Sequence, residues 1–200
     1  MTLFRLAAML VSLVLVPLPV TAAPPPEPTV EYSADSTMET EGGMTMKFRV
    51  YHTPTKQRME MGGADGSVTI TRKDKKVVWQ VMGDMYMETP LDQSNAPDMG
   101  GFDIQEQTEV GEETVNGLKT TKTKIIATKP DGSKFGGFFW TTKEGVTVKM
   151  DLLSKDGDKK MRMASELTNV KIQKQDPALF EVPAGATKND MGAMMGQGGM

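Results

Sequence analysis

The sequence predicts a mainly β fold, a curved antiparallel meander that forms an unclosed half barrel with little helix. Apolar and polar residues alternate along most of the chain, short Gly-containing turns separate the alternating runs, and helical patterns are scarce. Because successive side chains of a strand point to opposite faces, alternation indicates strands that bury one face. The turns are too short for the crossover connections of parallel strands, so neighbouring strands should be antiparallel.

The N-terminal segment predicts export. Residues 1–22 carry a single cation, Arg5, then an apolar run from Leu6 to Val20, and small residues at the expected cleavage point after Ala22, as in a secretory signal peptide. The chain has no cysteine, so its fold is held without disulfides, which suits a bacterial periplasmic protein. We therefore expect a periplasmic or secreted protein whose signal peptide is cleaved.

Alternation begins after the Pro-rich residues 23–29, which we expect to form a tether. A strand-like stretch, TVEYSADSTME, is followed by one in which Met44, Met46, Phe48 and Val50 share a face. The next segments repeat this alternation, with apolar sets at Met59 and Met61, at Val68 and Ile70, and at Val77, Trp79 and Val81.

The middle of the chain interrupts the pattern. Pro97, Gly100 and Gly101 break up residues 91–107, which should form a loop or lid. Alternation then resumes, with apolar sets at Val146, Val148, Met150 and Leu152 and at Met161, Met163 and Leu167. Asp176 followed by Pro177 predicts one helical turn, because Asp caps a helix and Pro suits its first position.

These segments define one β domain over residues 30–188, followed by a disordered Met- and Gly-rich tail over residues 189–200. A sheet that is apolar on one face must cover that face with a second layer or by curling on itself. Since little helix is predicted, curling is favoured. The apolar set should then line a concave face.

Several stretches resemble the LolA/LolB-like lipoprotein-carrier superfamily, and in particular an uncharacterised branch of it, a domain of unknown function. DPALFEVPAG, which follows SELTNVKIQ, is similar to the end of that domain, and KVVWQVMGDMYMETP is similar to its middle strands. GEETVNGLKTTKTKI and FFWTTKEGVTVKM resemble its later hairpins. The resemblance implies an unclosed antiparallel barrel that binds an acyl or other apolar group. No functional residue is carried over, because the cavity arginine of the carriers has no identified counterpart.

Four Met-x-Met pairs stand out, and each would place two thioethers on one strand face. The pairs are Met44 and Met46, Met59 and Met61, Met85 and Met87, and Met161 and Met163. Three interpretations stay open: ordinary core, an adaptable lipid-lined cavity, or soft ligands for Cu(I). The predicted binding residues for an acyl chain, a lipid or an acylated protein are Met46, Phe48, Met59, Met61, Trp79, Met85, Met87, Val148, Met150, Met161 and Met163. Contact with a membrane is a further possibility that this apolar face leaves open.

Copper is the alternative ligand, with tail residues Met191, Met194, Met195 and Met200 as candidate ligands; otherwise no cofactor is expected. The only histidine, His52, is expected to be solvated beside a turn. Catalysis is not predicted, because nucleophile, zinc-protease and phosphate-loop motifs are absent. The carboxylates Asp35, Glu39, Glu60 and Asp151 fall on expected outward faces. A net charge of −3 without a basic, aromatic stripe argues against nucleic acid. A purely structural envelope component remains a third class.

Overall fold

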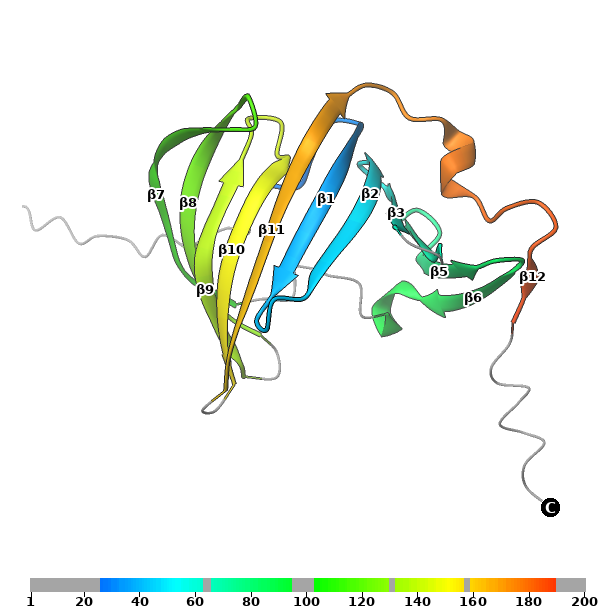
Figure 1. Cartoon of the computed structure of the whole chain (residues 1–200), viewed down its shortest axis with the longest axis horizontal. Helices are drawn as coiled ribbons and strands as arrows, with labels where there is room; N and C mark the ends of the chain where they lie inside the picture. The colour runs from blue at the N-terminus through cyan, green and yellow to red at the C-terminus, as the bar shows by residue number, and fades with distance from the viewer. Residues whose placement is uncertain (1–25, 63–65, 95–102, 130–131, 157–158, 190–200) are drawn as a thin grey trace, which may run out of the picture.

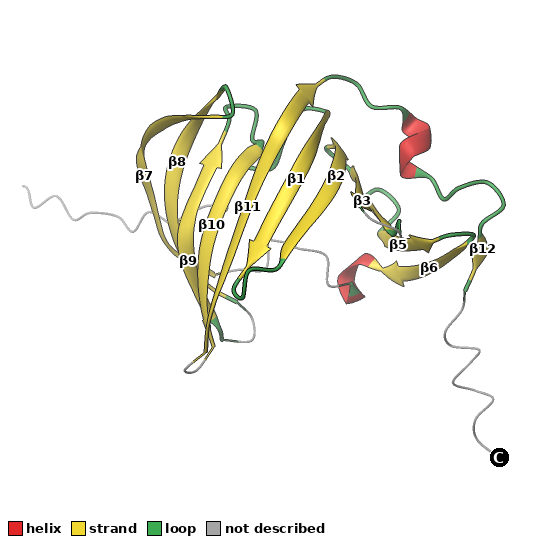
Figure 2. Cartoon of the chain, viewed as in Figure 1, coloured by secondary structure: helices red, strands yellow, loops and turns green. Residues whose placement is uncertain are grey.

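The computed structural model describes residues 26–62, 66–94, 103–129, 132–156 and 159–189, apart from the side chains of residues 156 and 159. In these residues the chain forms one twelve-stranded sheet and two short 3-10 helices (Figures 1 and 2). The strands are β1 Tyr32–Thr40, β2 Thr45–Thr53, β3 Lys56–Met61, β4 Val68–Arg72, β5 Val77–Met82, β6 Met85–Pro90, β7 Asp103–Val115, β8 Leu118–Thr128, β9 Lys134–Thr141, β10 Thr147–Asp156, β11 Lys159–Ile172 and β12 Thr187–Lys188. The helices are η1 Leu91–Gln93 and η3 Pro177–Phe180.

Strand β1 joins two meanders into one sheet. The order across the sheet is β12-β6-β5-β4-β3-β2-β1-β11-β10-β9-β8-β7, so β1 lies between its hairpin partner β2 and the late strand β11. All of these pairs are antiparallel except β12 with β6. Strand β7 and the short β12 form the two edges, and the sheet is not closed into a barrel. The predicted fold class, an unclosed antiparallel half barrel with little helix, is confirmed.

The sheet curls strongly, as the contacts of Glu27 show. Its side chain pairs with Lys73, after β4, at 2.8 Å. Its carbonyl oxygen lies so close to Gly145, just before β10, that a Cβ there would be 2.5 Å away. Strands β4 and β10 are five places apart in the sheet, or about 24 Å if it were flat. One residue can touch both turns only because the sheet bends around it.

This geometry defines the inner face. Pro26 shares a cavity wall with Ile125 and Phe139, so the N-terminal segment lies on their side of the sheet. Residues directly opposite each other in neighbouring strands point to the same face. The pairing register therefore identifies the residues of this face strand by strand, from β8 to β6. We call it the inner face and the opposite one the outer face. Ile125, Ala127, Phe135, Phe139 and Leu152 form a buried cluster there.

A second core lies on the outer face of β4 and β5. Ile70, Trp79 and Val81 are buried there against Phe180 of η3, which is 1% exposed. The predicted helical turn is thus confirmed, and the side chain of Asp176 accepts the amide hydrogen of Ala178 as expected of a cap. The sheet therefore has apolar clusters on both faces, one under its own curl and one under the C-terminal segment.

Arg72 fastens that C-terminal segment to the sheet. Its buried guanidinium donates to both oxygens of Asp74, at 2.8 and 2.7 Å, to the carbonyl oxygen of Phe180 at 3.0 Å, and to the Glu181 carboxylate. A buried guanidinium is stable only when its donors are satisfied in this way. The ion pair therefore fixes the position at which Phe180 enters the outer core.

Parts of the predicted domain layout lie outside the described residues, namely the signal peptide and the tail after residue 189. Residues 26–29, expected to be a tether, instead make specific contacts. Besides the Glu27 pair, the amide of Thr29 donates to the carbonyl oxygen of Glu144 at 3.0 Å. Within the described ranges, no helix has the length and apolar character needed to cross a bilayer.

Replacing Phe180 by alanine should lower the free energy of unfolding by about 3 to 5 kcal/mol, because it empties the centre of the outer core. Urea unfolding followed by circular dichroism measures the change. Ile172→Ala is the control, since Ile172 is half exposed and its loss should cost less than about 1 kcal/mol. Equal effects of the two substitutions would mean that η3 does not hold the strands.

Stability should also depend on pH through Asp74. Hydrogen bonds from Arg72 lower the pKa of Asp74 to about 2 in the folded protein, against about 3.9 in an unfolded chain. The carboxylate therefore stabilises the fold above about pH 4, and this contribution is lost as the pH falls towards 2. Melting curves of the protein and of Asp74→Asn should differ at pH 7 and converge near pH 2. A difference that persists unchanged at the lowest pH would contradict the assignment.

Candidate functional site

The methionines of the sheet gather on the inner face. Of the eleven methionines that the structure describes, ten lie there and the eleventh, Met44, lies in the β1–β2 turn. The ten are Met38, Met46, Met59, Met61, Met82, Met85, Met87, Met150, Met161 and Met163. They come from seven strands, and seven independent choices between two faces would agree in about one case in 60. The arrangement is therefore a property of the face and not of any single strand.

Cross-strand register brings these side chains together. Met38 is directly opposite Met46, Met59 is opposite Val50, and Met61 is opposite Phe48. On the other side of β1, Met163 is opposite Leu152. Side chains directly opposite in antiparallel strands have Cβ atoms about 5 Å apart. The inner face thus carries an apolar surface from β3 to β10, and Thr69 of β4 and Gln80 of β5 lie between it and Met87 of β6.

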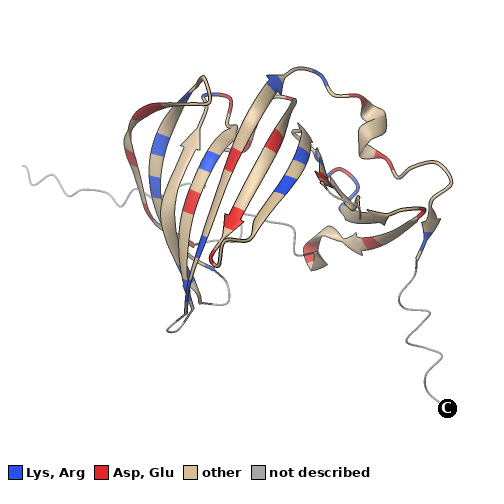
Figure 3. Cartoon of the chain, in the orientation of Figure 1, with Lys and Arg blue, Asp and Glu red and all other residues tan. Residues whose placement is uncertain are grey.

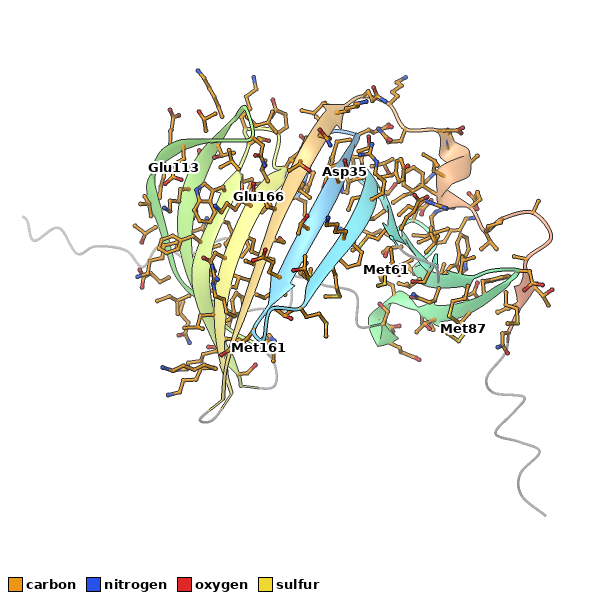
Figure 4. All side chains as sticks on the ribbon, viewed as in Figure 1. Asp35, Met61, Met87, Glu113, Met161 and Glu166 are labelled. Carbon is orange, nitrogen blue, oxygen red and sulfur yellow. The ribbon has the colours of Figure 1, made fainter. Side chains whose placement is uncertain are left out.

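The two ends of this face differ. At the end that carries the β1–β2, β3–β4 and β5–β6 turns, methionine side chains are exposed: Met44 by 64%, Met61 by 43%, Met82 by 43%, Met85 by 46% and Met161 by 58%. We call it the open end; Figure 4 labels Met61 and Met161. At the other end, residues 26–29 cross the curl between the β4–β5 and β9–β10 turns. We call it the closed end.

A cavity of about 250 Å³ lies beside this N-terminal segment. Ile125 and Phe139 supply apolar lining, and the remaining wall is mostly polar: Gln107, Thr121, Thr123, Thr141, Thr142 and Lys143, with Pro26. The threonine hydroxyls and the ammonium group could receive a polar group. The apolar surface of the methionines begins on the same face, at Met150 and Met163, which pack against the Ile125–Phe139 cluster.

Every predicted binding residue except Trp79 lies on the inner face or is buried with its residues. Val148 is fully buried with Ala34, Val50 and Leu167. The pairing register places the other nine on the inner face, namely Met46, Phe48, Met59, Met61, Met85, Met87, Met150, Met161 and Met163. Sequence reasoning missed Met38 and Met82. It also missed Phe135 and Phe139, because KFGGFFWT has aromatic residues on both strand faces and so does not alternate. Whether these residues bind a ligand stays a prediction.

The assignment of Trp79 to the concave face is wrong. Trp79 is paired with Ile70 and Glu88 on the outer face, where it is 8% exposed and packs against Phe180. Its indole N–H donates to Glu88 at 2.8 Å, and this bond together with Lys188 lowers the pKa of that carboxyl. Alternation shows that Val77, Trp79 and Val81 share a face, but only the pairing register shows which face, and the C-terminal segment covers it.

Away from β4 and β5, the outer face carries many ion pairs, and its charged residues appear as blue and red bands in Figure 3. Arg49 pairs with Asp35 at 2.8 Å and Arg162 with Asp151 at 2.8 Å. Hydrogen bonds from Asn169 and Arg49 lower the pKa of Asp35. Asp35, Glu39, Glu60 and Asp151 all lie on this face, as predicted. They face away from the methionines, and Asp35, Glu60 and Asp151 each form an ion pair with an arginine.

His52 is not the solvated residue that was expected. Its ring stacks on Tyr32 with centroids 5.0 Å apart, and burial lowers the pKa of His52. Burial also raises the pKa of Tyr32 to about 12. No group of three or more His, Asp or Glu suited to a metal ion occurs in the part of the chain that the structure describes. The candidate copper ligands of the tail lie outside that part.

No family model and no curated protein matches the chain. Among solved structures, MucB has a similar fold, with a TM-score of 0.53, 11% identity, and coverage of 80% of this chain and 59% of that one. A structure of MucB in complex with MucA(peri) gives a TM-score of 0.50 at 14% identity and covers 78% and 55% of the two chains. The chain thus matches little more than half the length of MucB.

A DUF1329 family protein from Desulfovibrio piger matches less well, with a TM-score of 0.40, 13% identity and coverage of 76% of this chain and 90% of that one. The unclosed antiparallel sheet that the resemblance to the LolA/LolB-like superfamily implied is the fold that the structure has. At these identities the comparisons concern the fold alone.

Brief treatment with hydrogen peroxide should oxidise the methionines in the order of their exposure. Met44 and Met161 should react first, and the half-buried Met150 and Met163 much later. Peptide mass spectrometry after a time course measures the order. Oxidation of Met150 as fast as that of Met44 would show that the inner face is open along its whole length.

Proposed function

We propose that the chain is a non-catalytic periplasmic binding protein whose inner face holds the acyl chain of a lipid or of a lipidated protein. The observation that carries this proposal is the placement of ten methionines from seven strands on one curved face. A core that needed only stability would favour the better-defined rotamers of Leu, Ile and Val. Methionine instead gives a flexible, polarizable surface that adapts to chains of different length and shape.

The energetics suit reversible binding. Each methylene of an acyl chain that leaves water contributes about 0.8 kcal/mol, so eight of them contribute about 6 kcal/mol before the cost of ordering the chain. No polar partner is required along the methionine surface. Release then needs a competing apolar site, such as a membrane or a second carrier, and not a chemical step.

The two ends suggest a direction of entry. The N-terminal segment bridges the closed end through Glu27 and Thr29, whereas methionines are exposed at the open end. An acyl chain would enter at the open end and lie along Met61, Met46 and Met163 towards the cavity beside Pro26. MucB, which has the similar fold, is found in complex with the protein MucA(peri), and this supports a protein as one class of partner.

Copper is the second candidate, and two pairs of methionines favour it. Met38 is directly opposite Met46, and Met82 is directly opposite Met85, so their thioether groups are close enough to share a soft ion such as Cu(I). Tail residues Met191 and Met195 could add ligands. A structural envelope component, with the methionines as ordinary core, is the third class.

Changing Met161 to lysine should weaken binding of a fluorescent fatty acid at least tenfold, because a charge would be placed on the inner face at the open end. Met61→Lys should act in the same direction from β3. Titration of the fluorophore measures the affinities, and circular dichroism checks the fold.

Leu153→Lys is the matched control. Leu153 is 49% exposed at the same end and one strand from Met161, but it lies on the outer face. Its replacement should leave the affinity unchanged. If Leu153→Lys weakens binding as much as Met161→Lys, or if both inner-face variants bind normally, the inner face is not the binding site.

Native mass spectrometry of the mature protein, purified from an envelope fraction without chelator, separates the three classes. Added mass of lipid size is the expected result. Added mass in copper-sized steps, lost on deletion of residues 191–200, would favour the metal instead. A bare protein that also fails to bind the fluorescent fatty acid would leave the structural interpretation.

A further inference from the structure

Three lysines form a row across the tip of the sheet at the open end. Lys134 of β9 is directly opposite Lys155 of β10, which is directly opposite Lys160 of β11. All three side chains are exposed, and none makes an ion pair or hydrogen bond to the residues that the structure describes. Like charges directly opposite one another in a sheet are destabilising. Figure 3 shows this blue tip below the banded part of the sheet.

The contrast with the rest of the outer face is sharp. In the middle of the sheet, Lys149 pairs with Glu166, Arg162 with Asp151, Lys124 with Glu106 and Lys122 with Glu113. Among the residues whose side chains the structure describes, the row at the tip has no such partners. Its one acidic member is Asp103 of β7, which lies two strands beyond Lys134, on the far side of Thr128. In a chain of net charge −3, three lysines thus lie directly side by side with no ion pair to the described residues.

Exposed apolar side chains lie beside the lysines. Leu153, one row up the outer face, is 49% exposed, and Met161, next to Lys160 on the inner face, is 58% exposed. The β1–β2 turn, with Met44 64% exposed, is held at the same end, because the amide of Glu41 donates to the carbonyl oxygen of Arg162 at 2.9 Å. Cations and apolar groups therefore adjoin the place where the methionine surface opens.

We propose that this tip docks on an anionic phospholipid bilayer, with Lys134, Lys155 and Lys160 against the phosphates and with Leu153, Met161 and Met44 at the acyl boundary. A bilayer supplies both negative charge and an apolar layer behind it, which this combination of side chains requires. Each basic residue near an anionic surface strengthens binding about fivefold, so the row would contribute on the order of 100-fold. Docking would place the open end at the membrane, where an acyl chain can pass without entering water; this role in transfer rests on the proposed function.

The charges near the tip agree with this orientation. Asp151 pairs with Arg162, Glu39 lies near the same guanidinium, and Glu41 accepts the amide hydrogen of Arg162. These acids thus face Arg162, one or more rows from the lysines. An acidic protein could also meet three lysines, but the exposed apolar residues beside them would remain in water. The bilayer is therefore the occupant that the whole patch favours.

The test is co-sedimentation of the mature protein with vesicles of phosphatidylcholine alone or mixed with phosphatidylglycerol. The protein should bind the anionic vesicles and not the neutral ones. The triple variant Lys134→Gln, Lys155→Gln and Lys160→Gln should lose binding on the order of 100-fold. A control triple variant, Lys76→Gln, Lys119→Gln and Lys174→Gln, removes three exposed lysines from the closed end and should bind as the unchanged protein does.

Fatty-acid binding in solution is measured on the same variants, so that failure of docking is distinguished from failure of the proposed function. Both triple variants should bind the fluorescent fatty acid normally. Equal vesicle binding by the two triple variants, or no preference for anionic vesicles, would overturn the docking proposal. Release from vesicles by inorganic phosphate, but not by sodium chloride at equal ionic strength, would also overturn it, because the row would then be a site for free anions.

Discussion

Cross-strand register is the constraint on which the inner face depends. In a strand the side chains alternate, so a shift of one residue in the pairing of β3 would turn Met59 and Met61 from the inner to the outer face. Seven strands have to keep register for the ten methionines to share one surface. Tight turns contribute to this, and Asn116 and Gly117 between β7 and β8 both adopt positive φ, as a two-residue hairpin turn requires. The binding surface is thus a collective result of many local pairings.

The curl of the sheet depends on positions where a side chain cannot fit. A Cβ on Gly137 of β9 would lie 2.0 Å from the carbonyl oxygen of Asp151, and one on Gly145 would meet the backbone of Glu27. The first glycine lets β9 approach β10 closely, and the second lets the N-terminal segment cross the closed end. Glycine within a strand commonly marks such bends and close approaches. The shape of the inner face is therefore set as much by missing side chains as by the methionines.

Electrostatics divides the outer face into three regions. The strands β4 and β5 are covered by η3, which the buried guanidinium of Arg72 holds in place. The central strands remain in water and carry paired charges, such as Arg49 with Asp35. At the open end the pairing stops, and Lys155 with its neighbours is left without acidic partners among the described residues. Protein, water and, in our proposal, membrane are thus the three surroundings of one sheet face.

The sequence by itself determined the antiparallel pairing and most strands outside the middle of the chain, because these follow from alternation within one segment and from turn residues beside it. It did not determine the start of β7, since residues 103–107 were expected to belong to a loop but are part of that strand. The cap at Asp176 and the outward carboxylates were also local features. Only the tertiary structure decided which face each strand turns inward. Trp79 was misplaced for that reason, since its strand alternates like the others but packs against Phe180, a residue 101 positions later in the chain. The lysine row was equally invisible, because Lys134, Lys155 and Lys160 become neighbours only when three strands pair in this register.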